Sequence, residues 1–116
     1  MSSRKLVRTT TVAVYDGDTE ERFVLEYYTL EKESYVDGMS VNTYGIEVLK
    51  RGKTQFGTLK VEYRKIFDVF CSEFEAAYVA SVLADNTVTP VSVCDIIEQF
   101  IGTDEIVCEE YEIAAV

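Results

Sequence analysis

The chain has no histidine, only one proline and only three cysteines among its 116 residues. Without histidine, no Ser–His or Cys–His nucleophile can form within the chain. Cys71, Cys94 and Cys108 are spaced too widely for a CxxC zinc site, and their odd number in a small protein indicates reduced thiols. Glycine-rich phosphate-binding motifs are also absent. We therefore predict that the protein is not an enzyme and that it uses no cofactor and no metal.

Basic residues are absent from the second part of the chain. All 11 lysines and arginines lie at or before Lys65, so residues 1–65 have 10 acids against 11 bases, a net charge of +1. Residues 66–116 have 11 acids and no base, and the two parts sum to −10. Contact with nucleic acid phosphates requires a basic face. The sequence therefore predicts no direct binding to nucleic acid and an attraction, weakened by salt, to a protein partner with a basic surface.

Long apolar runs are absent as well, so the sequence predicts no membrane span and no membrane partner. Residues 1–14 contain neither a long apolar core nor a small-residue cleavage site, which predicts a cytoplasmic protein without a signal peptide. A chain of 116 residues that is 47% hydrophobic is long enough to build one core without help from a metal or a disulfide.

Four segments rich in β-branched and aromatic residues predict strands, over residues 4–15, 21–31, 40–50 and 58–71. Asp-Gly pairs at residues 16–17 and 37–38 predict tight turns. Gly45 inside the third segment indicates a bulge or a close approach by another backbone. The fourth segment has an apolar row that Lys65 interrupts, which favours a bulge there. That row consists of Leu59, Val61, Tyr63, Phe67, Val69 and Cys71.

Two helices are predicted after these strands. Ser72 and Glu75 form a capping box that starts the first helix, which ends at residues 85–86. Its expected apolar side consists of Phe74, Ala77, Tyr78, Ser81 and Val82, widened by Val79 and Leu83. The second helix is predicted over residues 89–102, with Thr89 as its cap, Pro90 in its first turn and Gly102 after its end. Its apolar stripe consists of Val93, Ile96, Ile97, Phe100 and Ile101.

These elements predict an α+β fold. Short turns between four strands imply an antiparallel meander, since parallel pairs need long crossovers. Two helices that follow the strands are expected to pack on one face of that sheet. We assign residues 1–103 to a single α+β domain and residues 104–116 to an acidic C-terminal tail, which either adds a short edge strand or lies loose.

The segment from Val88 to Glu98 carries a resemblance to a known family. It reads Val88-Thr89-Pro90, then Val93, then Asp95-Ile96-Ile97-Glu98. With the strand that contains YGIEV, this segment resembles a family of small Firmicutes proteins, clostridial in particular, that have a C-terminal VTPxxxxDIIE-type helix and no established activity. The resemblance covers residues 20–102 and implies a fold and a bacterial or phage origin.

Acidic side chains near the C-terminal end form a candidate partner surface. It consists of Asp95, Glu98, Asp104, Glu105, Glu109, Glu110 and Glu112. Asp95 and Glu98 lie three residues apart on one helix face, a spacing that can hold a hard cation, but the solvated side of an amphipathic helix is the simpler interpretation. The acidic surface either provides solubility or imitates the phosphates of a nucleic acid.

Three classes of function stay open, in this order. The first is a small, acidic, non-enzymatic protein-binding or regulatory module, which includes a homodimer formed through a sheet face or an edge strand. The second is an acidic inhibitor from a phage or mobile element that mimics nucleic acid, like an anti-CRISPR protein. The third is a small-molecule-binding or enzymatic domain, which requires a cleft where two carboxylates converge. Sensitivity of the partner contact to salt separates the first two.

Overall fold

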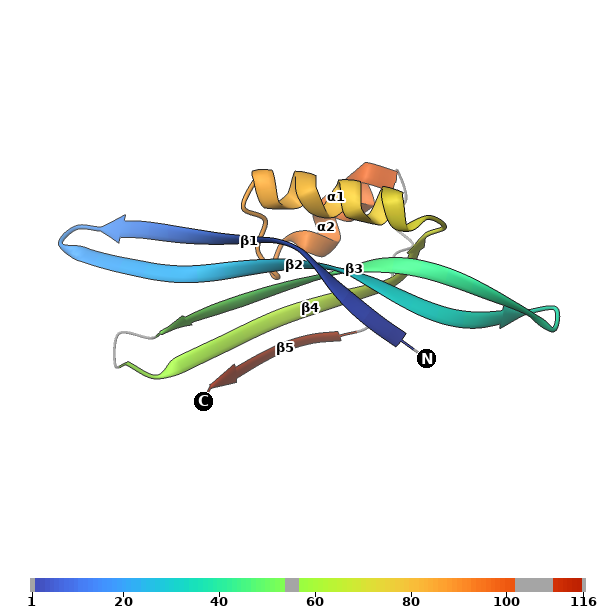
Figure 1. Ribbon diagram of the computed structural model, residues 1–116. Helices are drawn as coiled ribbons and strands as arrows, with labels where there is room; N and C mark the ends of the chain where they lie inside the picture. Colours follow the sequence, from blue (N-terminus) through green and yellow to red (C-terminus); the bar gives the residue numbers. More distant parts are fainter. Residues whose placement is uncertain (1, 54–56, 102–109, 116) are drawn as a thin grey trace.

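The computed structural model describes residues 2–53, 57–101 and 110–115 (Figure 1). The described chain forms a five-stranded sheet in the order β1-β2-β3-β4-β5, and every neighbouring pair is antiparallel. The elements in chain order are β1 (Ser2–Asp16), β2 (Thr19–Val36), β3 (Met39–Lys53), β4 (Leu59–Phe70), α1 (Glu73–Asp85), α2 (Val93–Ile101) and β5 (Glu110–Ala115).

This architecture confirms the predicted α+β fold. Strands β1 to β4 form the expected meander, and both helices lie on the same side of the sheet (Figure 1). Helix α1 lies against β1, β2 and β3. Strand β5 pairs with β4 from Lys65↔Glu110 to Lys60↔Ala115, so residues 110–115 form the edge strand that was one of the two alternatives. The rest of the predicted tail, residues 104–109 and 116, lies outside the described residues.

The strands are longer than the sequence predicted. Residues 32–36, which lie beyond the strand predicted over residues 21–31, continue the ladder between β2 and β3 as far as Val36↔Met39. The turns themselves lie where they were predicted, with Gly17 at a φ of 62° and Gly38 at a φ of 78°, a conformation that glycine adopts at little cost. Because the helices cover only the middle of the sheet, the β1–β2 and β2–β3 hairpins extend past them as arms (Figure 1). The molecule is 58 Å long.

Gly45 lies where β4 bulges toward β3. A Cβ atom at Gly45 would lie 1.9 Å from the carbonyl oxygen of Ile66, so only glycine fits there. The register between the two strands shifts at this point, between Tyr44 and Ile46, and Asp68 adopts a φ of 58°. The predicted close approach at Gly45 is therefore confirmed. The expectation of a bulge at Lys65 is wrong, because Lys65 pairs in regular register with Glu47.

The regular register of β4 with β3, up to the pair Ile46↔Ile66, decides which side of β4 faces the helices. Ile66 and Phe70 are 0% and 3% exposed and belong to the core cluster beneath α1 and α2. Tyr63 pairs with Leu49 and thus lies on the opposite face from Ile66, which pairs with Ile46. The predicted apolar row is therefore split. Its first part lies on the face turned away from the helices, while Val69 packs against the core.

The start of α1 was predicted correctly, and the start of α2 was not. The side chain of Ser72 accepts a hydrogen bond from the backbone N–H of Glu75 at 3.4 Å, which confirms the N-cap of α1. Helix α2 begins at Val93, not at Thr89. The carbonyl of Thr89 accepts from the backbone N–H groups of Ser92 and Val93, at 3.2 and 3.1 Å. Residues 89–92 thus form a separate turn that leads into the helix.

The core lies between the sheet and the helices, with Tyr27 near its centre. The side chain of Tyr27 is 0% exposed, and its hydroxyl donates to the carbonyl of Val88 at 2.9 Å. Burial raises the pKa of Tyr27 to about 12. Helix α2 contributes Val93 and Ile97 to this core, both 0% exposed, as its apolar stripe predicted. The side chains of Phe100 and Ile101 lie outside the described residues.

The cysteines require a correction. Cys94 is buried and disulfide-bonded, so the prediction of a reduced thiol is wrong at this position. Cys71 is exposed and free.

Candidate functional site

The outer surface of α1 exposes two large aromatic side chains. Phe74 is 83% exposed and Tyr78 is 60% exposed, and the two lie one helical turn apart. The buried side of the same helix is formed by Ala76, Val79, Ala80, Leu83 and Ala84. The predicted apolar side of this helix is therefore confirmed at Val79 and Leu83, which are buried, and wrong at Phe74 and Tyr78. Three alanines lie on the buried side beside Val79 and Leu83, and the aromatic residues face solvent, because small side chains let α1 approach the strands closely.

The charged residues of the helix layer are all acidic. On α1 they are Glu73, Glu75 and Asp85, and on α2 they are Asp95 and Glu98. We call Phe74, Tyr78 and these five acidic residues the helix-layer surface. It combines exposed aromatic area with negative charge, the two features that attract a basic and partly apolar partner.

Two basic residues of β1 neutralise part of this surface. Lys5 lies 3.8 Å from a carboxylate oxygen of Glu73, and Arg8 pairs with Asp85. The same arginine reaches the carbonyl of Ser81 at 3.5 Å. These pairs link α1 to the edge strand, but they are exposed, so each contributes little to stability. Within the described part of the chain, Glu75 and Asp95 form no ion pair.

The structure places only part of the predicted acidic surface. Asp95 is exposed and Glu98 is half-buried, both on α2. Glu110 and Glu112 are backbone partners of Lys65 and Tyr63 in the β4–β5 ladder. The other three predicted residues, Asp104, Glu105 and Glu109, lie outside the described residues. The structure thus brings Asp95 and Glu98 together on α2 and assigns Glu110 and Glu112 to the sheet.

The face of the sheet turned away from the helices carries charges of both signs, and they pair with each other. Arg4 lies 3.1 Å from Glu47 and stacks over the ring of Tyr28, 4.3 Å from its centroid. The hydroxyl of Tyr28 donates to Glu26 at 3.0 Å, and Arg51 donates to the other oxygen of Glu26 at 2.6 Å. We call these five residues the open-face network. It shields Tyr28, which is only 8% exposed, and Glu47, which is 1% exposed.

The pKa of Glu26 reflects its place in this network. Burial by itself would raise the pKa of Glu26, but hydrogen bonds from Arg51 and Tyr28, together with the charges of Arg51 and Arg4, outweigh that effect and lower it. Burial and the adjacent Glu26 raise the pKa of Tyr28. The network is therefore arranged to keep Glu26 ionised and Tyr28 protonated, which suits a fixed structural role.

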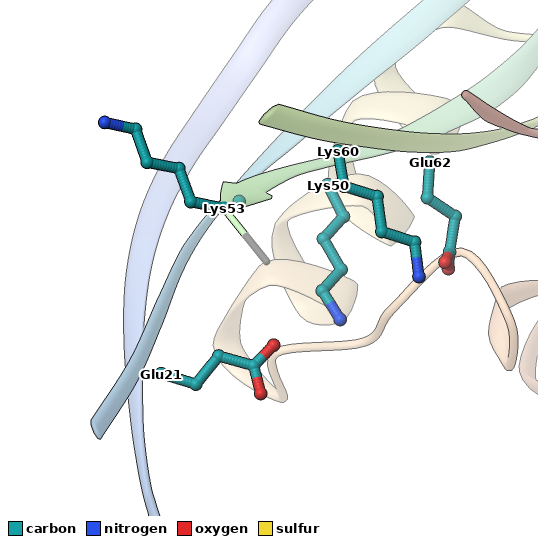
Figure 2. Close-up of a pocket in the computed structure, with 6 residues that line it drawn as sticks. Glu21, Lys50, Lys53, Lys60 and Glu62 are labelled. Atoms are coloured by element: carbon teal, nitrogen blue, oxygen red, sulfur yellow. The ribbon is translucent and has the colours of Figure 1, made fainter. Parts of the chain in front are cut away.

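A shallow hollow lies on the helix side of the sheet, near the ends of β2, β3 and β4. It is lined by Glu21, Lys50, Gly52, Lys53, Lys60 and Glu62. Figure 2 shows the amino groups of Lys50 and Lys60 directed into this space, whereas Lys53 points away from it. Charges of both signs line the hollow, so it selects neither an anion nor a cation. Among the described residues, no group of histidine, cysteine, aspartate or glutamate is placed to hold a metal.

Comparison with known proteins gives one match. The model of a family of unknown function, DUF6514, matches residues 7–103. The chain belongs to this family. Searches of curated proteins and of solved structures give no match. Within the described residues of this DUF6514 member, no helix is long and apolar enough to cross a membrane.

The sequence reasoning missed Phe74 and Tyr78 as candidate surface residues. It assigned them to the buried side of α1 because they repeat with helical spacing. The available signal was a second apolar side on the same helix, which includes three alanines, Ala76, Ala80 and Ala84. When a helix has two apolar sides, the side with smaller residues can approach a sheet more closely.

Proposed function

We propose that this DUF6514 member is a non-enzymatic protein-binding or regulatory module, and that it docks a basic, partly apolar partner on the helix-layer surface. The observation that supports this proposal is the exposure of Phe74 and Tyr78, 83% and 60%, on a helix whose charged residues are all acidic. Exposed aromatic residues are disproportionately the anchors of protein interfaces. Acidic residues around them favour a partner with a basic rim.

The open-face network is a less suitable docking surface than the helix-layer surface. Its charges are paired with each other, and its tyrosine is covered by Arg4. A surface whose polar groups already have partners gains little from a new one. The helix-layer surface keeps Glu75 and Asp95 without ion pairs in the described part of the chain, so a partner can still gain from pairing with them.

The second candidate function is the acidic mimic of nucleic acid. It is favoured by the absence of lysine and arginine from α1 and α2. It is weakened by the pairing of Glu73 with Lys5 and of Asp85 with Arg8, because a phosphate mimic needs accessible carboxylates. We therefore rank the protein-binding module first.

Capture from an extract of the source cell tests the proposal. The probes are the wild-type protein, the double variant Phe74→Ser/Tyr78→Ser, and the control Tyr35→Ser, which changes a tyrosine that is 72% exposed on the β2–β3 arm. We expect wild type and Tyr35→Ser to retain the same partner, and the double variant to lose it. Retention by all three probes would contradict the proposal. Salt separates the two candidate functions. A binding module is expected to keep part of its partner at about 500 mM salt, whereas a mimic of nucleic acid is expected to lose its partner between about 50 and 200 mM salt.

We further propose a bacterial, Firmicutes origin, on the resemblance of the VTPxxxxDIIE segment, and, as a separate proposal, the cytoplasmic location that the sequence predicted. Alkylation of thiols in intact cells tests the location. Structural disulfides are rare in a reducing compartment, so the disulfide of Cys94 weighs against a cytoplasmic location, which requires that Cys94 react with an alkylating reagent in intact cells without prior reduction. A Cys94 that becomes reactive only after a reductant is added would instead indicate an oxidising compartment.

A further inference from the structure

Strand β1 forms one edge of the sheet, and the part of the chain that the structure describes places no strand along its outer side. An antiparallel strand directs its N–H and C=O groups alternately to its two sides. The outward groups of β1, which is 15 residues long, are therefore available to another strand. A long edge of this kind pairs with other chains unless charges, prolines or bulges prevent it.

The two halves of β1 differ in this protection. The first half contains Arg4, Lys5 and Arg8 and a register irregularity between Leu6 and Arg8. Residues 9–15, Thr-Thr-Thr-Val-Ala-Val-Tyr, contain no charge, no glycine and no proline. Thr9, Thr11 and Ala13 are exposed, and Tyr15 is 71% exposed. The second half is thus an open edge with high strand propensity.

We propose that residues 9–15 of β1 pair antiparallel with the same residues of a second copy of this chain. The pairing joins the two sheets edge to edge, with a two-fold axis at Val12. This inference goes beyond the proposed docking function, because it uses a different surface and a different partner. An axis perpendicular to the sheet leaves both helix-layer surfaces on the same side, free to bind.

The positions of the charged residues in β1 favour pairing with a second copy of the chain in one register. With Val12 on the axis, Thr9 lies opposite Tyr15, Thr10 opposite Val14, and Thr11 opposite Ala13, so every pair from 9 to 15 is uncharged. Just beyond this segment, position 8 is basic and position 16 is acidic, so the residues that close the ladder have opposite charges. Registers centred nearer the N-terminus place Arg8 opposite Arg4 or Lys5, and like charges in that position are unfavourable.

The contact between the two β1 strands is expected to be weak and to become stronger as salt is added. Seven paired residues form less than the area of a standard stable interface. Each copy also has a net charge of −10, so long-range repulsion opposes association and salt relieves it. Added salt therefore strengthens this dimer, whereas it weakens the contact with a basic partner. The two proposals can fail separately.

Sedimentation analysis of the full chain over about 1 to 500 µM tests the dimer, the range in which small interfaces associate. We expect a monomer–dimer equilibrium for wild type. Thr11→Lys/Ala13→Lys places introduced positive charges opposite each other across the axis and is expected to weaken dimerisation at least about tenfold. Thr11→Lys/Ala13→Glu places opposite charges there and is expected to dimerise at least as well as wild type. Circular dichroism confirms that each variant is folded.

Two results would overturn the inference. One is a wild-type protein that stays monomeric over the whole range of concentration, at low and at high salt. The other is a pair of folded variants that dimerise equally, which would show that β1 is not the contact. Hydrogen exchange adds a local readout, because amides within residues 9–15 are expected to gain protection as concentration rises, while Tyr35 and its neighbours do not.

Discussion

The helix-layer surface and the open-face network contain similar kinds of residue but use them differently. Each has aromatic rings and carboxylates. On the open face, Arg4 covers Tyr28, and Glu26 and Glu47 have arginine partners. On the helix layer, Phe74 and Tyr78 are exposed, and Glu75 has no ion pair within the described chain. The charged and polar groups of the open-face network pair with each other and contribute to stability. The helix-layer surface keeps aromatic area and carboxylates that can bind a partner.

The largest expected effect concerns the packing beneath the helix layer. Replacing Ile97, which is 0% exposed, by alanine leaves a cavity under α2 and is expected to lower the free energy of unfolding by about 2–5 kcal/mol. The control is Val91→Ala, because Val91 is 58% exposed and its truncation is expected to cost less than about 0.5 kcal/mol. Urea unfolding measures both. Equal costs would contradict the assignment of α2 to the core.

The next effect concerns the hydrogen bond between the sheet and the helix connection. Tyr27→Phe removes the donor to the carbonyl of Val88 and is expected to cost about 1–3 kcal/mol at neutral pH. Because burial raises the pKa of Tyr27 to about 12, its stabilising contribution is complete below the unfolded pKa of about 10 and is lost as pH rises toward 12. Thermal unfolding at alkaline pH should therefore show a smaller loss of stability with pH for Tyr27→Phe than for wild type.

The third prediction breaks the open-face network. Arg4→Ala leaves the carboxylate of Glu47, 1% exposed, without its guanidinium and uncovers Tyr28. Breaking a fully buried pair costs several kcal/mol, but Arg4 is 46% exposed, so we expect about 1–2 kcal/mol. The matched control is Arg22→Ala, which removes an exposed pair with Glu20 and is expected to have almost no effect. A cost for Arg4→Ala no larger than that of the control would show that the network does not stabilise the sheet.

The smallest stability effect appears at acidic pH. The pKa of Glu26 is lowered, so its contribution to stability is present above its unfolded pKa of about 4.3 and is lost as pH falls through the folded value. Arg51→Ala removes a main cause of this shift and is expected to cost less than about 1 kcal/mol at neutral pH. The variant should lose less stability than wild type between about pH 4.5 and 2. Parallel pH profiles for the two proteins would contradict this account.

The sequence predicted the order of elements because its turn and cap signals are local. The Asp-Gly pairs, the Ser72 cap and the apolar stripe of α2 are each decided by neighbouring residues. The faces of β4 and α1 were assigned correctly only in part, since they depend on distant parts of the chain. Ile66 faces the helices because it pairs with Ile46 on β3, and the burial of Ala76 and Ala80 follows from how closely α1 packs.

The sequence predicted that the candidate surface is acidic, but it did not predict which acidic residues form it. Composition identified an acidic second half, but it could not separate Asp95, which is exposed on α2, from Glu110, which is a strand residue. It also could not show that Lys5 and Arg8, far earlier in the sequence, lie beside α1. Pairing between distant residues decides which charges remain available for a partner, and no short pattern reports it.

Site-specific photo-crosslinking in the source cell tests the central claim, that the helix-layer surface is the docking surface. A photoreactive amino acid replaces Tyr78 in one protein and Tyr35 in another, and both positions are highly exposed in the free chain. We predict a single cross-linked protein partner from position 78, lost on adding Phe74→Ser, and no such product from position 35. A partner cross-linked from position 35 and not from position 78 would contradict the claim.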